Sequence, residues 1–478
     1  MPALPRGALT VAAIVCIGLG AAWGRLGAGD LATPVNRPAF FGGLVLIVTG
    51  SVIAYGCVGA GSGLPPRTLV AVAVLIASAA QPGYFFSALQ LAALGGVLAS
   101  SVLLGRRMSA AALLAGLGLL TWFTAQHWAW GHANIDVFAE VQGAASSLLH
   151  GQNPYDPVYR VIIDTGHGLA PTGSGHFGYG PAVILLSLPG AVLGDVRLSA
   201  ALVGVSIPVA AFLMARSHGA PAWFCRSLVA VWLGLGFLPL MTLADWTDTF
   251  SVAGFVWWLA LRGERPTAAR LALGLAMAAK PSMLPLLVPF LLWQRSAWRD
   301  AVWAVIVAAV VVLPFAIWTG VATLAYDVAG VYVDLPLRHD SLNLNGAAAM
   351  VGLPSISAPW VAAGGAAALV LLVLRRPRIA ADLTLLGAAL FVWLCLPAKQ
   401  AFYNYYFVAA AALLMALAAA GAEQTRLVSP LTVPFRLIRR YLHVAPSTAP
   451  SQRRSGRASA ATIRSDGYAS DRIHHPVG

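Results

Sequence analysis

Long apolar runs separated by short polar segments dominate the sequence. The first five lie at 8–26, 40–58, 66–80, 84–105 and 110–130. Further apolar runs follow at 198–215, 221–241, 249–262, 267–279, 282–294, 301–319, 357–374, 379–396 and 402–421. Many of these runs reach the length that a helix needs to cross bilayer hydrocarbon. The pattern therefore predicts an all-α polytopic membrane protein with about 12–15 transmembrane helices.

Two places in this pattern decide the topology. The run 178–194 contains two prolines, so it either crosses the membrane or dips in and returns. The short runs 267–279 and 282–294 are broken at Lys280 and Pro281 and have arginines at their far ends. If the break lies outside and the arginines inside, the positive-inside rule holds to the end of the membrane region. The odd or even number of membrane crossings then favours a segment at 178–194 that dips into the membrane and returns to the same side.

One polar island stands out, at residues 131–160. From 137 to 149 its apolar residues recur at helical spacing, and a glycine and a proline follow. This segment is too short to span a bilayer, so we predict an amphipathic helix on the membrane surface. Asp136 and Glu140 would lie one turn apart on one face of that helix. Helix capping by Asp136 is the alternative explanation for this aspartate.

Composition supports the membrane assignment. Of the 478 residues, 59% are hydrophobic and 10% are charged, whereas soluble domains carry roughly 25% charged residues. The net charge of +13 comes from basic residues in loops and in the C-terminal tail, which indicates membrane topology and no nucleic-acid partner. The four cysteines lie inside apolar runs, which favours neither disulfides nor a zinc site.

Both ends of the chain have an expected role. We expect the first run, 8–26, to remain as a span because it lacks a clean signal-peptide cleavage site. The predicted parts are an N-terminal transmembrane extension (1–105), a transmembrane core (106–422) with an external loop at 131–177, and a basic tail (423–478). The tail is polar and rich in Ser and Arg, so we expect disorder on the cytoplasmic side.

On this topology most acids fall on the external face, together with both lysines. The external set is Asp136, Glu140, Asp156, Asp164, Asp195, Asp245, Asp248, Lys280, Asp327, Asp334, Arg338, Asp340 and Lys399. Lys280 and Lys399 are the only lysines among the 30 basic residues. In so arginine-rich a chain, a lysine is a candidate for a task that needs a compact ammonium group.

An external acid beside basic groups at a membrane suits a lipid-phosphate substrate. The acid would take a proton from an acceptor hydroxyl. A lysine or arginine would hold the phosphate that becomes the leaving group. A sugar carried on polyprenyl phosphate reaches such a site sideways from the bilayer.

Several segments resemble a known family. The order of Asp, amphipathic helix and Asn-Pro-Tyr at 136–155 is similar to the first external loop of GT-C glycosyltransferases that use polyprenyl-phosphate sugars. It most resembles glycosyltransferase family 87, the polyprenol-phosphomannose-type mannosyltransferases of actinobacteria. The resemblance continues at 179–181, at LALGLAMAAKPSMLPLLVPFLLW (271–293) and at AKQAFYNYYFVAAAALL (398–414).

This resemblance implies an inverting, metal-independent transfer that needs no cofactor. The general base would be Asp136, with Glu140 as its substitute. Lys280, Lys399 and Arg338 would bind the donor phosphate. Residues expected to contact sugar or lipid are Asn153, Tyr155, Tyr179, His339, Gln400 and Tyr403.

The sequence departs from the family pattern twice. Gly180 stands where the family has the first proline of a Pro-Pro pair, and four or five predicted spans precede the Asp136 loop where the family typically has one. The resemblance implies a mannosyltransferase of the plasma membrane, with its site on the extracytoplasmic face. The acceptor would be a hydroxyl of a cell-envelope glycolipid or glycan.

Four alternatives stay open. An arabinofuranosyltransferase of the same fold is one, and transfer to lipid of a group other than a sugar is another. A lipid-linked-sugar flippase or transporter would place ionisable groups at mid-membrane and show internal repeats. Here nearly all charges lie at span ends, and no repeat at a fixed offset is visible. A non-catalytic scaffold, in which 131–160 only caps the helices, is the fourth. Oligomeric state is not addressed by these patterns.

Overall fold

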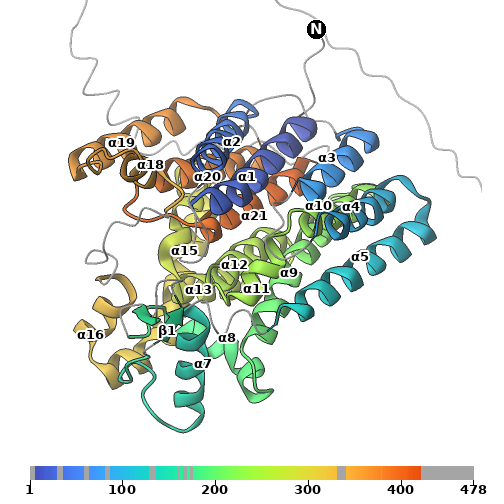
Figure 1. The fold of residues 1–478 in the computed structure, drawn as a ribbon. Coiled ribbons are helices and arrows are strands. Elements are labelled where there is room, and N and C mark those ends of the chain that lie inside the picture. Colours follow the sequence, from blue (N-terminus) through green and yellow to red (C-terminus); the bar gives the residue numbers. More distant parts are fainter. Residues whose placement is uncertain are drawn as a thin grey trace, which may run out of the picture. The chain divides into compact units, whose positions relative to one another are not determined.

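The computed structural model describes residues 6–28, 36–58, 64–80, 87–128, 136–159, 161–164, 169–172, 176–330, 341–377 and 379–420 (Figure 1). The predicted tail at 423–478 lies outside these residues. The described residues are overwhelmingly helical and all belong to one unit, Met1–Leu431. The predicted helical, polytopic fold class is confirmed at this level.

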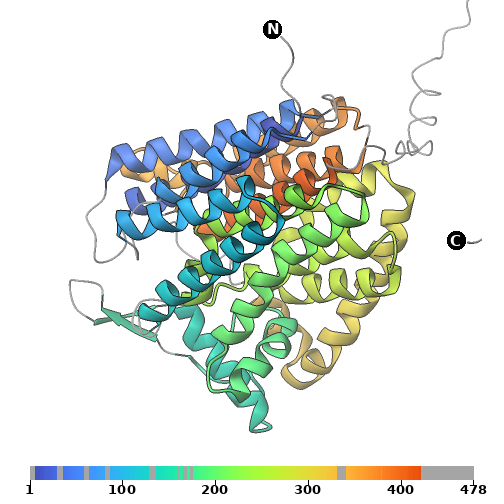
Figure 2. The same ribbon diagram turned by 90° about the vertical axis from the view of Figure 1, so that its right-hand side faces the viewer.

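The first five predicted spans are five helices. They are α1 (Arg6–Ala28), α2 (Arg37–Gly56), α3 (Arg67–Ala79), α4 (Ala88–Leu103) and α5 (Arg106–Gln126). Glycines let α1 and α2 approach closely, since a Cβ on Gly20 would lie 2.6 Å from the Gly43 carbonyl oxygen. The blue N-terminal helices lie beside the orange-red C-terminal ones, and α1 packs against α21 (Tyr403–Ala420) (Figures 1 and 2). The predicted boundary at residue 105 stays a prediction.

The loop between α5 and α8 (Pro181–Val192) contains the predicted helix as α7 (Asp136–Leu149). It also contains β1 (Val161–Asp164) and β2 (Leu169–Thr172), which pair antiparallel with Val161 opposite Thr172. This short hairpin is an unpredicted addition to an otherwise helical fold. A run of β-branched Val161, Ile162 and Ile163 favours a strand, but it is too short to stand out among the long apolar runs.

Helix α8 (Pro181–Val192) is flanked by two contacts to other helices. Just before it, the Gly180 N–H donates to the Ala279 carbonyl at 3.0 Å. Just after it, Asp195 accepts a hydrogen bond from Trp128, which follows α5. The dipping segment that the number of crossings favours at 178–194 stays a prediction.

The middle of the chain forms α9 (Arg197–Ser217), α10 (Ala222–Gly234), α11 (Phe237–Leu243) and α12 (Asp248–Leu261). The predicted run 221–241 is two helices, α10 and α11, bent by 53° at Gly236. Gly236 has φ of +68°, a left-handed conformation that glycine adopts without steric cost.

The predicted break at Lys280 is present. Helix α13 (Pro266–Ala279) ends there, and the 3₁₀ helix η1 (Pro281–Leu286) and α14 (Val288–Trp293) follow. Helix α15 (Arg295–Thr319) begins six residues before the predicted run 301–319, because its first turns are polar but still helical. The remaining elements are α16 (Val321–Ala325), the π-helical turn η2 (Tyr326–Gly330), α18 (Leu344–Met350), α19 (Ala358–Leu374), α20 (Ala380–Cys395) and α21.

Polar groups of α12, α13 and α15 gather at opposite ends of these helices. At one end, Asp300 accepts from Arg270 at 3.0 Å and from the Trp258 indole at 3.3 Å. At the other end, Lys280 meets Asp248. The α15 surface between them is apolar and exposed, including Val310 and Ile317 at 67% and 75%.

Apolar exposure of this kind fits a lipid surround. Five helices, namely α1, α2, α5, α9 and α15, are long and apolar enough to cross a membrane, and the bent pair α10–α11 makes a sixth. The protein is membrane-embedded.

Candidate functional site

Two acids stand on the first turns of α7. Asp136 begins the helix, is partly exposed, and accepts from the Val137 N–H at 2.9 Å. This bond satisfies one of the free N–H groups of the first turn, so capping and chemistry both remain open to Asp136. Glu140, one turn later, is 5% exposed. Burial, and then the negative charge of Asp136, raise the pKa of Glu140 well above its usual range.

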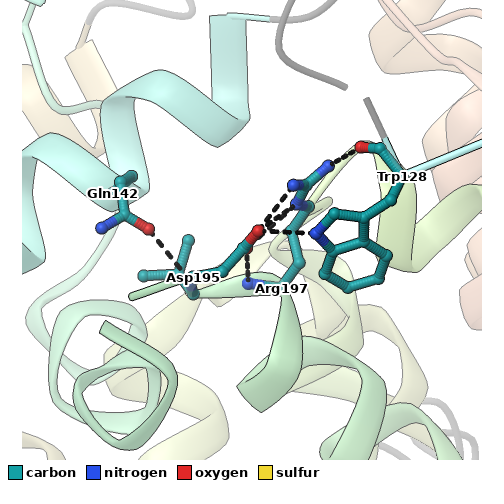
Figure 3. Close-up of polar contacts among 5 residues, drawn as sticks. Trp128, Gln142, Asp195 and Arg197 are labelled. Carbon is teal, nitrogen blue, oxygen red and sulfur yellow. Dashed lines mark hydrogen bonds and ion pairs between the residues drawn. The ribbon is translucent and has the colours of Figure 1, made fainter. Parts of the chain in front are cut away.

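A charged cluster holds the chain beside these acids (Figure 3). The Arg197 guanidinium is fully buried and donates to Asp195 from Nε at 2.9 Å and from Nη2 at 2.6 Å. Asp195 also accepts from the Trp128 indole at 2.9 Å. Burial alone would raise the pKa of Asp195, but the bonds from Arg197 outweigh it, and the pKa falls below its usual range. The cluster is therefore an ion pair with its acceptors satisfied.

The same arginine positions α7. Its guanidinium carbon lies 4.4 Å from the centre of the Phe138 ring and 4.3 Å from that of Trp128. Gln142 of α7 accepts from the Val196 N–H at 2.9 Å (Figure 3). Phe138 and Gln142 both belong to α7, the helix that carries Asp136 and Glu140. They keep α7 at the junction of α5, α8 and α9.

The turn after α7 is held by Asn153. Its side-chain oxygen accepts from the Tyr155 N–H at 3.2 Å and from the Thr319 hydroxyl at 3.1 Å. Its amide nitrogen donates to Asp156 at 2.7 Å. Asn153 is 6% exposed and links the loop to the end of α15. The structure thus gives this predicted contact residue a positioning role in the loop.

An aromatic chain leads from this turn towards Lys280. Tyr155 donates its hydroxyl to the Tyr179 carbonyl at 2.8 Å. The Phe177 ring lies 5.5 Å from the rings of both tyrosines. Tyr155 is 1% exposed, so its pKa is raised mainly by burial and also by the negative charge of Asp327. Tyr155 therefore stays a neutral hydrogen-bond donor.

Lys280 sits at the end of this chain in a buried polar group. Its ammonium lies 2.9 Å from Asp248 and 5.8 Å and 5.1 Å from the ring centres of Tyr179 and Tyr405. Asn404 also donates to Asp248. Lys280 is 8% exposed. Its charge is therefore opposed by a buried carboxylate and faced by two aromatic rings.

The last loop brings the second lysine to the same end. Lys399 and Gln400 are both partly exposed. The neighbouring Ala398 carbonyl accepts from the side chains of Asn343 at 2.8 Å and Asn345 at 2.9 Å, which pins this loop. Of the two lysines, Lys399 is the more exposed residue.

Tyr403 lies on another side of α21 from the residues around Lys280. It is 3% exposed, and its ring packs 4.7 Å from Phe237 and 5.9 Å from Trp246. Two further predicted residues, Arg338 and His339, lie outside the described residues. The structure thus groups three predicted site residues, Tyr155, Tyr179 and Lys280, with Asn153 close to Tyr155. Tyr403 instead packs inside the helix bundle.

Four polar residues at this end were not predicted as site residues. Asp248, Asn404 and Tyr405 surround Lys280. The fourth, Asp327, is 5% exposed on the π-helical turn, and its Oδ2 has no hydrogen-bond partner among the described residues. Burial raises the pKa of Asp327, while His176 opposes this rise. A π-helical turn is a frequent signal of a functional site.

Asp245 is the most unusual carboxyl group of the described chain. It is fully buried, and neither carboxylate oxygen has a hydrogen-bond partner there. Its φ is +52°, in the left-handed region that aspartate tolerates better than most residues. Burial, and then the nearby charge of Asp195, raise its pKa well above the usual range, against the effect of Arg197. Burial therefore favours the neutral form of the Asp245 carboxyl group over its charged form.

Two acids three residues apart, Asp245 and Asp248, interrupt an apolar stretch. This signal in the sequence would have pointed to both of them. Within the described ranges, no three His, Cys, Asp or Glu side chains gather as metal ligands. No family model matches the chain, and no curated protein or solved structure matches it.

Proposed function

We propose that the protein is an integral membrane glycosyltransferase that moves a sugar, mannose first, from polyprenyl phosphate to a hydroxyl of a cell-envelope glycolipid or glycan. The transfer is inverting. The whole chain forms a GT-C-like bundle of about 12–15 spans, with its site on the extracytoplasmic face of the plasma membrane.

One observation carries this proposal. Four segments far apart in the sequence meet at one end of the bundle, and they are the four on which the family resemblance rests. Tyr155 bonds to Tyr179, Gly180 bonds to Ala279, and Lys280 faces Tyr405. A chance resemblance gives no reason for the four to be neighbours in space.

The different solvent exposure of the charged residues at this end of the bundle suggests a different role for each. Asp136 is partly exposed on the first turn of α7, so it can meet an acceptor hydroxyl and remove its proton. Lys399 is partly exposed on a pinned loop and binds the donor phosphate. Lys280, paired with Asp248, orients Tyr179 and Tyr405 and adds positive charge behind that phosphate.

One departure from the family pattern, the glycine at position 180, has a physical explanation. Gly180 replaces a proline where the chain passes the end of α13, and a Cβ there would lie 1.9 Å from the Ala278 carbonyl oxygen. Gly180 also donates its N–H to Ala279, which a proline cannot do. Close contact with the Lys280 break therefore requires glycine.

Radiolabelled sugar transfer tests the proposal. Purified protein in lipid nanodiscs would receive polyprenyl-phosphate mannose and a membrane-lipid acceptor fraction, and labelled product would be counted. Asp136→Asn should lower the rate about 100-fold or more, the range of general-base catalysis. Glu264→Gln is the matched control because it removes an exposed carboxylate at the far end of α12. Polyprenyl-phosphate arabinose in place of mannose decides the sugar.

A flippase gives a different result. It would move labelled lipid across proteoliposomes without forming product, and Asp136→Asn would leave that movement unchanged. Transfer that survives Asp136→Asn at the wild-type rate would remove Asp136 as the base. If no product forms with either donor, the proposal that the protein is a glycosyltransferase is refuted.

A further inference from the structure

A basic pocket lies at the end of the bundle opposite to α7. It has a volume of about 410 Å³ and is lined by residues of α3, α10 and the α4–α5 turn, including Arg67, Arg226, Trp223 and Gly105. Helix α5 runs from this pocket to Trp128 beside Asp195. Its 21 residues span about 31 Å, the thickness of bilayer hydrocarbon. The pocket therefore opens at the other membrane surface.

Two guanidinium groups give this pocket its charge. Arg67 is exposed, with its guanidinium 4.8 Å from the centre of the Trp223 ring. Arg226 is half-buried and donates from Nε to the Ser109 hydroxyl at 2.8 Å. These contacts fix both side chains and leave further guanidinium N–H donors for a ligand.

Acidic groups are absent from the elements that build the pocket. No Asp or Glu occurs from residue 64 to residue 135 or from residue 197 to residue 244. Helices α3, α5 and α10 also begin at the pocket, so the positive ends of their dipoles add to the same field. An anion is the complementary ligand.

The rim of the pocket identifies the source of that anion. Leu104 lines the pocket and is 40% exposed, and Leu69, Leu103 and Met108 beside it are 38%, 52% and 62% exposed. A soluble phosphate makes no favourable contact with exposed apolar side chains. The acyl chains of a lipid would cover them. At roughly 30 Å³ per water molecule, the pocket has room for more than a bare phosphate.

We propose that this pocket binds the phosphate of an anionic membrane phospholipid, with Arg67 and Arg226 on the phosphate and the exposed leucines on the acyl chains. The site is separate from the proposed transferase site and does not depend on it. Basic pockets between helices at a membrane surface are suited to lipid head groups.

Lipid titration followed by native mass spectrometry tests this. Detergent-purified protein would be titrated with phosphatidylglycerol and, separately, with phosphatidylcholine of the same acyl chains. We expect tighter binding of phosphatidylglycerol. The preference should fall about 25-fold in Arg67→Gln/Arg226→Gln, since each basic residue near a membrane contributes roughly fivefold. Arg67→Lys/Arg226→Lys, which keeps both charges, should retain most of the preference.

Arg265→Gln is the matched control. It removes an exposed positive charge at the same end of the bundle, outside the pocket lining, and should leave the preference unchanged. Equal wild-type binding of the two lipids would overturn the proposal without any variant. So would an equal loss in Arg265→Gln. Competition by inorganic phosphate or glycerol phosphate at the lipid's own concentration would assign a soluble anion and overturn the lipid as ligand.

Discussion

Replacing Gly180 by alanine perturbs the contact on which the site geometry depends. The φ and ψ of Gly180 are −69° and 154°, which alanine adopts without strain, so any cost is steric. The new Cβ would lie 1.9 Å from the Ala278 carbonyl oxygen and 2.9 Å from that of Ala279. Both are backbone atoms, so α8 or the end of α13 must move by more than about 1 Å to reach ordinary van der Waals contact.

Two terms give the expected magnitude. Overpacking costs about 1–3 kcal/mol, and weakening the 3.0 Å bond from Gly180 to Ala279 costs about 1 kcal/mol more. We therefore expect a loss of about 2–4 kcal/mol in the free energy of unfolding. In a thermal scan followed by tryptophan fluorescence, the apparent Tm should fall by roughly 2–5 °C.

Gly178→Ala is the matched control. It makes the same chemical change two residues away, where the nearest atom to the new Cβ is the Asp327 carbonyl oxygen at 3.7 Å, an ordinary contact. Its Tm should stay within about 1 °C of wild type. Equal Tm values for Gly180→Ala and wild type, or equal losses in the two variants, would refute the close packing of α8 against the Lys280 break.

Two further predictions concern buried charges. Asp248→Asn and Lys280→Met should each cost about 3–5 kcal/mol because each leaves a buried partner unpaired, and the double variant should cost at least about 1 kcal/mol less than the sum. Additive losses in denaturant titrations would contradict the pairing. For Glu140, whose folded-state pKa is raised, stability is fully present below the unfolded pKa of about 4.3 and is lost as pH rises through the folded pKa. Glu140→Gln should remove this fall from a Tm–pH profile, whereas Glu264→Gln should keep it.

Hydropathy and breaker residues predicted most of the fold because they act locally. Apolar runs define the long helices, and Lys280–Pro281 ends α13 where the pattern predicts a break. The early start of α15 was missed because RSAWRD is polar, although a helix continues through polar residues at a membrane surface. The β1–β2 pair was missed because strand pairing depends on a partner that no local pattern names.

The site was predicted in part, for a related reason. Tyr155, Tyr179 and Lys280 belong to recognisable local motifs, and the fold brings them together. Asp248 and Asn404 were not predicted as site residues, because their role depends on a pairing between residues 156 positions apart in the chain.

Lys280 shows why this matters for mechanism. Its residue type alone suggests a free ammonium for a phosphate, yet its environment contains a carboxylate at 2.9 Å and two tyrosine rings. A charge already opposed at that distance attracts a second anion less than an accessible one does. On exposure we therefore propose Lys399 as the ligand of the donor phosphate, and Lys280 as the residue that holds the surrounding side chains in place.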